Sequence, residues 1–128
     1  MDTPTSLRYT DSHEWVRADP DGHVTVGITA RAQDQLGELV YVELPAVGQQ
    51  LQRGDACAIV ESTKAASDVC TPIDGEVIAV NRCLADSPQS INHSPYQAGW
   101  LIRMRPSDPS QINDLLSPED YLAGQDTA

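Results

Sequence analysis

The sequence predicts a mainly β fold, either a sandwich of two antiparallel sheets or a flattened barrel. Short segments of alternating apolar and polar residues recur along its 128 residues, with turn residues at intervals of about 8–12 positions. Two of these segments, 54–59 and 75–80, resemble each other, and their glycines lie almost equally far before and after Lys64. We therefore expect a quasi-symmetric pair of strands, with the chain reversing between them at Lys64.

The N-terminal part predicts a hairpin. Residues 1–6 are expected to be flexible, and short strands are expected at 7–9 and 14–17. The run Asp-Pro-Asp-Gly at 19–22 is a turn signal, because proline presets one φ angle and glycine accepts a positive one. Valine and isoleucine then alternate with threonine and glycine over 24–28, which is typical of a half-buried strand.

A short helix is expected to follow this hairpin, over residues 30–36. Thr29 can cap its first turn, and Gly37 can end it in the left-handed conformation. The next apolar run, 39–44, is typical of a strand, and Pro45 stops it because proline has no N–H to donate to a sheet.

The middle of the chain predicts a hairpin around Lys64. Residues 56–61 and 67–70 have strand-like patterns, and the small polar residues 62–65 between them indicate a turn. A further strand is expected at 76–81. We expect the following stretch, 82–99, to be irregular, because prolines and a glycine interrupt it.

The C-terminal part predicts one more strand and then helices. The side chains of residues 100–105 alternate in a strand-like pattern that leaves one face exposed to solvent. Residues 111–116 and 118–123 look helical, the second beginning at Ser-Pro-Glu-Asp and ending before Gly124. The predicted organisation is a flexible N-terminus at 1–6, a single domain at 7–124 with a helical region from about 110 to 124, and a flexible tail at 125–128.

Charge and cysteine content narrow the function. The formal net charge of −11 disfavours binding to nucleic acid or to anionic membrane surfaces, which requires cations. We expect no membrane segment and no secretory signal, hence a bacterial cytoplasmic protein. The three cysteines, Cys57, Cys70 and Cys83, lie 13 residues apart. This spacing does not suit zinc, so we expect no metal site and interpret the cysteines as small buried hydrophobic residues.

Lys64 is the single lysine, whereas the chain has seven arginines. A preference for arginine spares positions that need a primary amine, because a guanidinium is not readily deprotonated or acylated. Glu61 and Asp68 lie nearby in sequence and favour the ammonium form, which argues against a Schiff-base or general-base lysine. Two further interpretations stay open at this point: a lysine that is merely solvated, and a Ser62–Lys64 nucleophile pair.

An ordered set of motifs resembles the H protein of the glycine cleavage system. The resemblance extends from about Tyr9 to Tyr121, and its ordered combination is specific although each short motif alone is weak. The motifs are Ser-His-Glu-Trp at 12–15, Val-Gly-Ile-Thr at 26–29, Val-Glu-Leu-Pro at 42–45, Val-Glu-Ser-Thr-Lys-Ala-Ala-Ser-Asp at 60–68, Gly-Glu-Val at 75–77, Val-Asn at 80–81, Ser-Pro-Tyr at 94–96 and Gly-Trp-Leu-Ile at 99–102.

The resemblance implies a lipoyl/biotinyl-type flattened β-barrel that carries lipoic acid on Lys64. The carrier itself has no catalytic residue. It shuttles the aminomethyl group of glycine from glycine decarboxylase to aminomethyltransferase, and dihydrolipoyl dehydrogenase then reoxidises it. The alternative is an H-like protein that relays lipoyl groups to 2-oxo acid dehydrogenase subunits. A monomer is expected.

The resemblance also assigns expected roles to residues around Lys64. Glu61, Ser62, Ala65 and Asp68 would form the flank that lipoylating enzymes recognise. Ser12 and Glu14 belong to a segment that lines a cleft for the arm in the family. Our hypothesis is that these two residues and Asp68 hold the loaded arm beside the predicted helix at 30–36, because its terminal amine needs acceptor oxygens.

Overall fold

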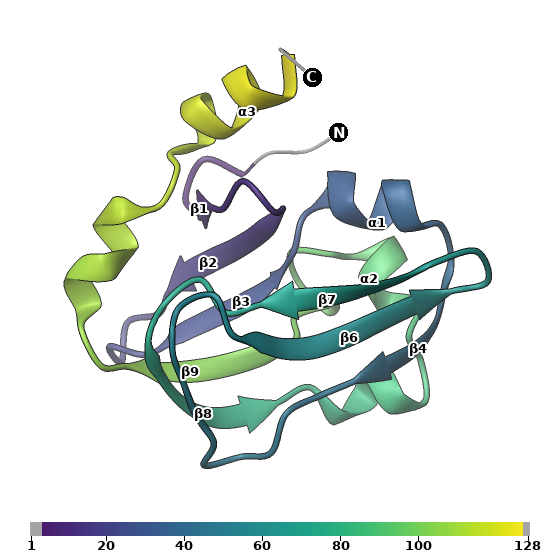
Figure 1. Cartoon of the computed structure of the whole chain (residues 1–128), viewed down its shortest axis with the longest axis horizontal. Coiled ribbons are helices and arrows are strands. Elements are labelled where there is room, and N and C mark those ends of the chain that lie inside the picture. The colour runs from purple at the N-terminus through teal and green to yellow at the C-terminus, as the bar shows by residue number, and fades with distance from the viewer. Residues whose placement is uncertain (1–3, 127–128) are drawn as a thin grey trace.

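The structure is a computed structural model that describes residues 4–126 and contains two antiparallel sheets. The larger sheet has the spatial order β1 (Arg8–Tyr9), β2 (Glu14–Ala18), β3 (Val24–Ile28), β9 (Ile102–Pro106), β8 (Gly75–Val80) and β5 (Gln50–Leu51). The smaller sheet has the order β4 (Leu39–Glu43), β6 (Ala56–Ser62) and β7 (Ala66–Cys70). Figure 1 shows the smaller sheet in front of β3, β9 and β8. The predicted mainly β fold is confirmed, as a two-sheet arrangement that does not close into a barrel within the described residues.

The main core lies between the two sheets and is aliphatic, as expected for a sequence without phenylalanine. Val26 on β3 and Met104 on β9 face Val42 and Val60 on the smaller sheet, and all four belong to one buried cluster. Burial of each such side chain stabilises the fold by about 1.5–3 kcal/mol. Since a slip of one residue would turn a strand's apolar face outward, this burial also fixes the register of the strands.

A second apolar cluster covers the other face of β1 and β2. Leu7, Tyr9 and Trp15 pack there with Tyr121 from α3 (Pro118–Asp126). The rings of Tyr9 and Tyr121 stack with centroids 4.7 Å apart. Tyr9 and Leu116 also exchange two backbone hydrogen bonds of 2.9 and 2.8 Å. The C-terminal part of the chain therefore fixes the segment that leads into β2 (Figure 1).

Strand β3 is buried on both faces, so the prediction of a half-buried strand is wrong. Gly27 pairs with Trp15, whose indole lies over it, and Thr25 pairs with Arg17. The guanidinium of Arg17 donates to the Thr25 hydroxyl at 3.2 Å. The small polar side of β3 is thus covered by two large side chains from β2 rather than by water.

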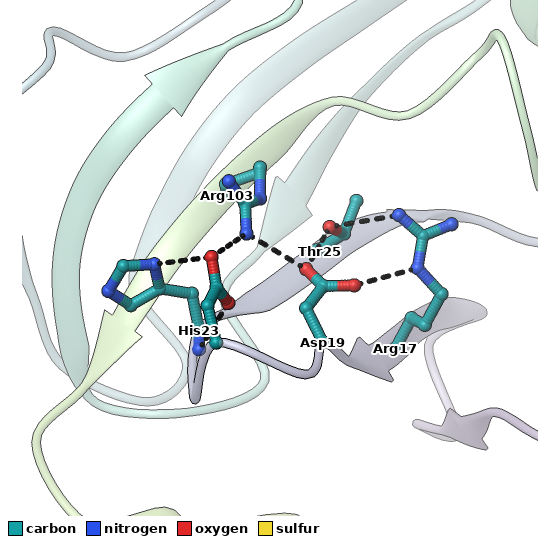
Figure 2. A network of polar contacts seen from close by, with 6 residues as sticks. Arg17, Asp19, His23, Thr25 and Arg103 are labelled. Carbon is teal, nitrogen blue, oxygen red and sulfur yellow. Dashed lines mark hydrogen bonds and ion pairs between the residues drawn. The ribbon is translucent and has the colours of Figure 1, made fainter.

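A polar network joins the β2–β3 turn to β9, as Figure 2 shows. Asp19 accepts hydrogen bonds from Arg17 at 2.9 Å and from Thr25 at 2.7 Å. Arg103 of β9 contacts Asp19 at 3.3 Å and Asp21 at 2.9 Å. The hydrogen bond from Arg103 holds the pKa of the Asp21 carboxyl at about 2. The network fixes the end of β2 that lies farthest from Glu14.

Helix α1 (Ala30–Leu36) has the predicted bounds. The Thr29 hydroxyl accepts a hydrogen bond from the backbone N–H of Ala32 at 3.2 Å. Gly37 ends the helix with a φ of 87°, and its N–H donates to the carbonyl of Gln33 at 2.9 Å. Both expected caps are therefore present.

Elements of one or two turns account for most of the incorrect secondary-structure predictions. The stretch expected to be irregular contains η1 (Arg82–Ala85) and α2 (Ser90–His93), and neither helix has a side-chain cap. The helix expected at 111–116 is the 3₁₀ helix η2 (Pro109–Asp114). Strand β5 has only two residues and was not predicted. These elements are too short to show a hydrophobic period.

The predicted flexible ends at 1–6 and 125–128 lie partly outside the described residues. In the described part of the N-terminal end, the carbonyl of Pro4 accepts a hydrogen bond of 2.6 Å from the Tyr9 hydroxyl. Helix α3 continues through Gly124 to Asp126, so the predicted end before Gly124 is wrong. Glycine permits the left-handed cap conformation but does not impose it.

Candidate functional site

Lys64 lies exposed at the tip of the β6–β7 hairpin, the turn that the sequence predicted. The backbone N–H of Ser62 donates to the carbonyl of Ala65 at 2.8 Å and closes the loop. The Ser62 hydroxyl accepts hydrogen bonds from the backbone N–H groups of Lys64 at 3.3 Å and Ala65 at 3.2 Å. These bonds fix the backbone of the tip and leave the lysine amine accessible.

The carboxylates near Lys64 in sequence lie on the outer face of the smaller sheet. Glu61 pairs with Ala66, and Asp68 pairs with Ile59, on the side opposite the buried Val60. Within the described residues, no ion pair joins Lys64 to either carboxylate. A lipoylating enzyme that recognised the residues around Lys64 would therefore meet two carboxylates that are not paired with the lysine.

The two similar segments that flank Lys64 lie in different sheets. The segment 54–59 leads into β6, and the segment 75–80 is β8, so they do not pair with each other. The chain does reverse at Lys64, but the partner of β6 there is β7. The two similar segments therefore do not form the expected quasi-symmetric pair of strands, because they belong to different sheets.

Glu14 is almost completely buried, with 3% of its surface exposed. Its carboxylate accepts hydrogen bonds of 2.6 Å from both the Thr10 and Ser12 hydroxyls, and a further one from the backbone N–H of Cys70. Burial raises the pKa of the Glu14 carboxyl above its usual value, and these hydrogen bonds oppose that shift. Glu14 thus connects the segment before β2 to the free edge of β7.

Helix α1 and strand β7 both lead from Lys64 towards Glu14. Helix α1 is preceded by its cap residue Thr29, whose N–H donates to the carbonyl of His13 at 3.0 Å. It ends at Gly37, where an added β-carbon would lie 3.4 Å from Lys64 Cε. Its seven residues span about 10 Å. Ser12 and Glu14 are hydrogen-bonded to each other, whereas no hydrogen bond joins Asp68 to either within the described residues.

Several residues of this region were missed by sequence reasoning. The hydroxyl of Tyr121 lies 2.8 Å from His13 Nδ1 and 2.9 Å from the Thr29 hydroxyl, so α3 meets the start of α1. His13 has a φ of 72°, which is uncommon for a residue other than glycine. Asn92 also links α2 to the end of α1. Such contacts between distant parts of the chain leave no local signal in the sequence.

A cavity of about 320 Å³ lies beside the smaller sheet, and neither Ser12 nor Glu14 lines it. Glu43, Ile59 and Asp68 line it, together with the loop after β4. Asp68 therefore faces this cavity, while the other two residues of the hypothetical arm cleft do not contribute to it.

The cysteine prediction holds only for Cys57, which is buried. Cys70 is half-buried and Cys83 is exposed, and all three thiols are free. Cys83 lies on η1, an element that the prediction did not contain, and this explains the error. Burial raises the pKa of the Cys57 thiol to about 12. Among the described residues, no group of histidines, cysteines and carboxylates could hold a metal ion, and no helix is long and apolar enough to cross a bilayer.

Comparison with known proteins gives a consistent result. The family described as "Glycine cleavage H-protein" matches residues 7–127. A glycine cleavage system H protein from Shewanella sp. (strain ANA-3) is 54% identical over 120 residues, covering 94% of this chain and 93% of the relative. The protein of that name from Shewanella sp. (strain W3-18-1) is 53% identical over the same length.

A solved structure is also similar. The crystal structure of a glycine cleavage system H protein from Mycobacterium marinum superposes with a TM-score of 0.86 and is 42% identical. The match covers 98% of this chain and 99% of that one. Neither this structure nor the Shewanella relatives favour, by name, the alternative of lipoyl relay to 2-oxo acid dehydrogenase subunits.

Proposed function

The chain belongs to the glycine cleavage H-protein family, the lipoyl carriers of the glycine cleavage system, and we propose on this premise that Lys64 is its lipoyl-bearing residue. One observation carries the proposal: the single lysine of the sequence lies exposed at a tight hairpin tip. The motif around it, Glu-Ser-Thr-Lys-Ala, is part of the ordered set of motifs that carries the family resemblance.

The residues at the tip fit an amide-linked arm. Acylation needs a primary amine that can lose a proton and attack an activated carboxyl carbon, whose activating group then leaves with its bonding electrons. Ser62 holds the backbone N–H groups of Lys64 and Ala65, so the tip keeps its shape while the side chain is modified. When bound, lipoic acid supplies a dithiolane that can accept the aminomethyl group and undergo reduction.

We further propose the finer partner set: glycine decarboxylase, aminomethyltransferase, dihydrolipoyl dehydrogenase and a lipoylating enzyme, in a bacterial cytoplasm. The three free cysteines suit a reducing compartment. The net charge of −11 favours fast, weak docking to basic faces, because complementary charge mainly raises the association rate. The protein acts as a carrier, and the catalytic groups belong to its partners.

The test of Lys64 is the intact mass of the protein after co-expression with a lipoylating enzyme. We expect one lipoyl adduct, placed on Lys64 by proteolytic digestion, and no adduct on Lys64→Arg. Since the sequence has no other lysine, an adduct that survives this substitution would lie on the α-amino group and would refute the assignment.

We also propose that Ser12, Glu14 and Asp68 hold the loaded arm along the free edge of β7. The backbone N–H of Cys70 points to Glu14, so the N–H of Asp68, two residues earlier, faces the same edge. Asp68 is exposed on β7, between Lys64 and Cys70. The Glu14 and Asp68 carboxylates would offer acceptor oxygens to the cationic amine at the end of the arm.

The arm proposal is tested by the rate at which the loaded carrier breaks down spontaneously. Glu14→Ala and Ser12→Ala should speed up this breakdown, while reduction of the unloaded lipoyl group by dihydrolipoyl dehydrogenase should hardly change. Ser87→Ala, at an exposed serine outside the site, is the matched control. Equal breakdown in the wild type and both site variants would show that this segment does not shelter the arm.

A further inference from the structure

The side chain of Lys64 lies across Gly37, the residue that ends α1. A β-carbon added to Gly37 would lie 3.4 Å from Lys64 Cε and 3.9 Å from Nζ. These are ordinary van der Waals distances, so the lysine stem passes over the side of Gly37 from which a side chain would project. Figure 1 shows the chain leaving α1 close to the tip of the β6–β7 hairpin.

Gly37 is held in place by Asn92 of α2. The Asn92 side-chain amide donates to the Gly37 carbonyl and to Gln33 Oε1, both at 2.9 Å. Its oxygen accepts a hydrogen bond of 2.8 Å from the backbone N–H of Leu39. Leu39 is fully buried and pairs with Ser62. The surface under the lysine is therefore fixed relative to the hairpin rather than being part of a loose loop.

We propose that Gly37, fixed by Asn92, is a positioning residue for Lys64: it supports the lysine stem and directs the amine to the α1 side of the hairpin. The proposal rests on the assignment of Lys64 as the lipoyl-bearing residue. Within the described residues the Lys64 ammonium has no ion pair, so Gly37 is the restraint that the proposal assigns to a long side chain with many rotamers. The α1 side is also the side that leads to Glu14.

The position demands glycine for two separate reasons. Its φ of 87° with a ψ of −165° lies in a region that is essentially restricted to glycine, so any substitution strains the backbone. A side chain longer than alanine's would in addition occupy the space of the Lys64 stem. Gly22 separates these effects, because it has the same φ of 87° but has no atom within 4 Å of an added β-carbon.

The first test reads the contact directly, in the unmodified protein. Because Lys64 is the single lysine, its Hε resonances are unique, and an NMR cross-peak between them and Gly37 Hα is expected. The cross-peak should be lost in Asn92→Ala and retained in Asn81→Ala. Asn81 is a matched control, since its amide bonds the carbonyls of Ala98 and Trp100 away from the hairpin. Absence of the cross-peak in the wild type overturns the proposal.

The second test is the rate of lipoylation by a lipoate ligase supplied with lipoate and ATP. We expect Gly37→Leu to lower kcat/KM for the acceptor protein about tenfold, because small misplacements of a reacting group have large effects on rate. Gly22→Leu also places a side chain at a positive φ but meets no neighbouring atom at its β-carbon, so it should be lipoylated at the wild-type rate. Equal rates for these two variants overturn the proposal. If Gly37→Leu does not fold, Asn92→Ala and Asn81→Ala provide the same comparison.

These outcomes distinguish the two proposals. A wild-type protein that shows the cross-peak but receives no lipoyl group on Lys64 refutes the proposed modification site, while the contact stands. A protein that is lipoylated on Lys64 at the same rate in the wild type, Gly37→Leu and Asn92→Ala confirms the site and refutes the positioning role of Gly37.

Discussion

Replacing Gly27 with alanine adds one methyl group directly under the indole of Trp15. Gly27 and Trp15 are cross-strand partners on β3 and β2. The added β-carbon would lie 2.6 Å from indole Cε2 and Cζ2. Carbon atoms attract each other best at about 3.5–4.0 Å, so the overlap is about 1 Å. The indole has no room to move, because it is fully buried and its Nε1 donates to the carbonyl of Pro95 at 3.0 Å.

Two opposing effects set the magnitude. Gly27 has an ordinary negative φ, so alanine would stabilise the fold by about 0.4–1 kcal/mol through the lower entropy of the unfolded chain. Overpacking a buried site costs about 1–3 kcal/mol. The structure therefore predicts that Gly27→Ala lowers the free energy of unfolding by about 1–2 kcal/mol.

Urea denaturation followed by far-ultraviolet circular dichroism measures this change without relying on tryptophan fluorescence. In a Trp15→Phe background the methyl group has more room, because phenylalanine lacks the indole nitrogen and the outer ring carbons. There Gly27→Ala should cost less, giving a coupling energy of about 1 kcal/mol in the double-mutant cycle. A Gly27→Ala protein as stable as the wild type would refute the packing argument.

Three other predictions concern charge and exposure. Lys64→Ala should change the free energy of unfolding by no more than about 0.5 kcal/mol, as exposed substitutions do, and a loss of several kcal/mol in urea denaturation would mean that the lysine is not an exposed tip. Burial raises the pKa of the Glu14 carboxyl, so the folded state holds this proton more tightly than the unfolded state does. The resulting contribution to stability is fully present below the ordinary pKa of the carboxyl, and it is lost as pH rises through its pKa in the folded state. Glu14→Gln should flatten this dependence in unfolding measurements from acidic to neutral pH, and an unchanged slope would contradict it. Arg103 holds the pKa of Asp21 at about 2, so Arg103→Ala should be less stable at neutral pH, and the difference should vanish as pH falls through about 2. A difference that is independent of pH would show that the ion pair is not its cause.

Local signals in the sequence predicted the parts of the fold that depend on local chemistry. Thr29 and Gly37 are cap residues, and α1 begins and ends where they place it. The small residues around Lys64 predicted the hairpin tip, because turns and hairpins are formed by neighbours in sequence. The accessible amine at this tip follows from the same neighbours, and it does not depend on how the sheets are arranged.

Contacts between distant residues were not predictable in this way. The burial of β3 on both faces depends on Trp15 and Arg17 lying across it, and the alternating pattern of β3 itself indicates only one apolar face. The support of Lys64 by Gly37 depends on Asn92, which lies in a stretch that was expected to be irregular. A glycine that ends a helix and a glycine that supports a lysine have the same appearance in a sequence.

The two sheets differ in how much of the chain must exist before each can form. All strands of the smaller sheet lie between residues 39 and 70, and its central hairpin joins residues no farther apart than Ala56 and Cys70. The larger sheet is joined through β3 and β9, where Val24 pairs with Met104, 80 positions later. During synthesis from the N-terminus, the strands around Lys64 leave the ribosome well before the partner of β3 has been made. We therefore expect the hairpin that bears the lysine to form early, from local contacts, and the core beneath it to close last.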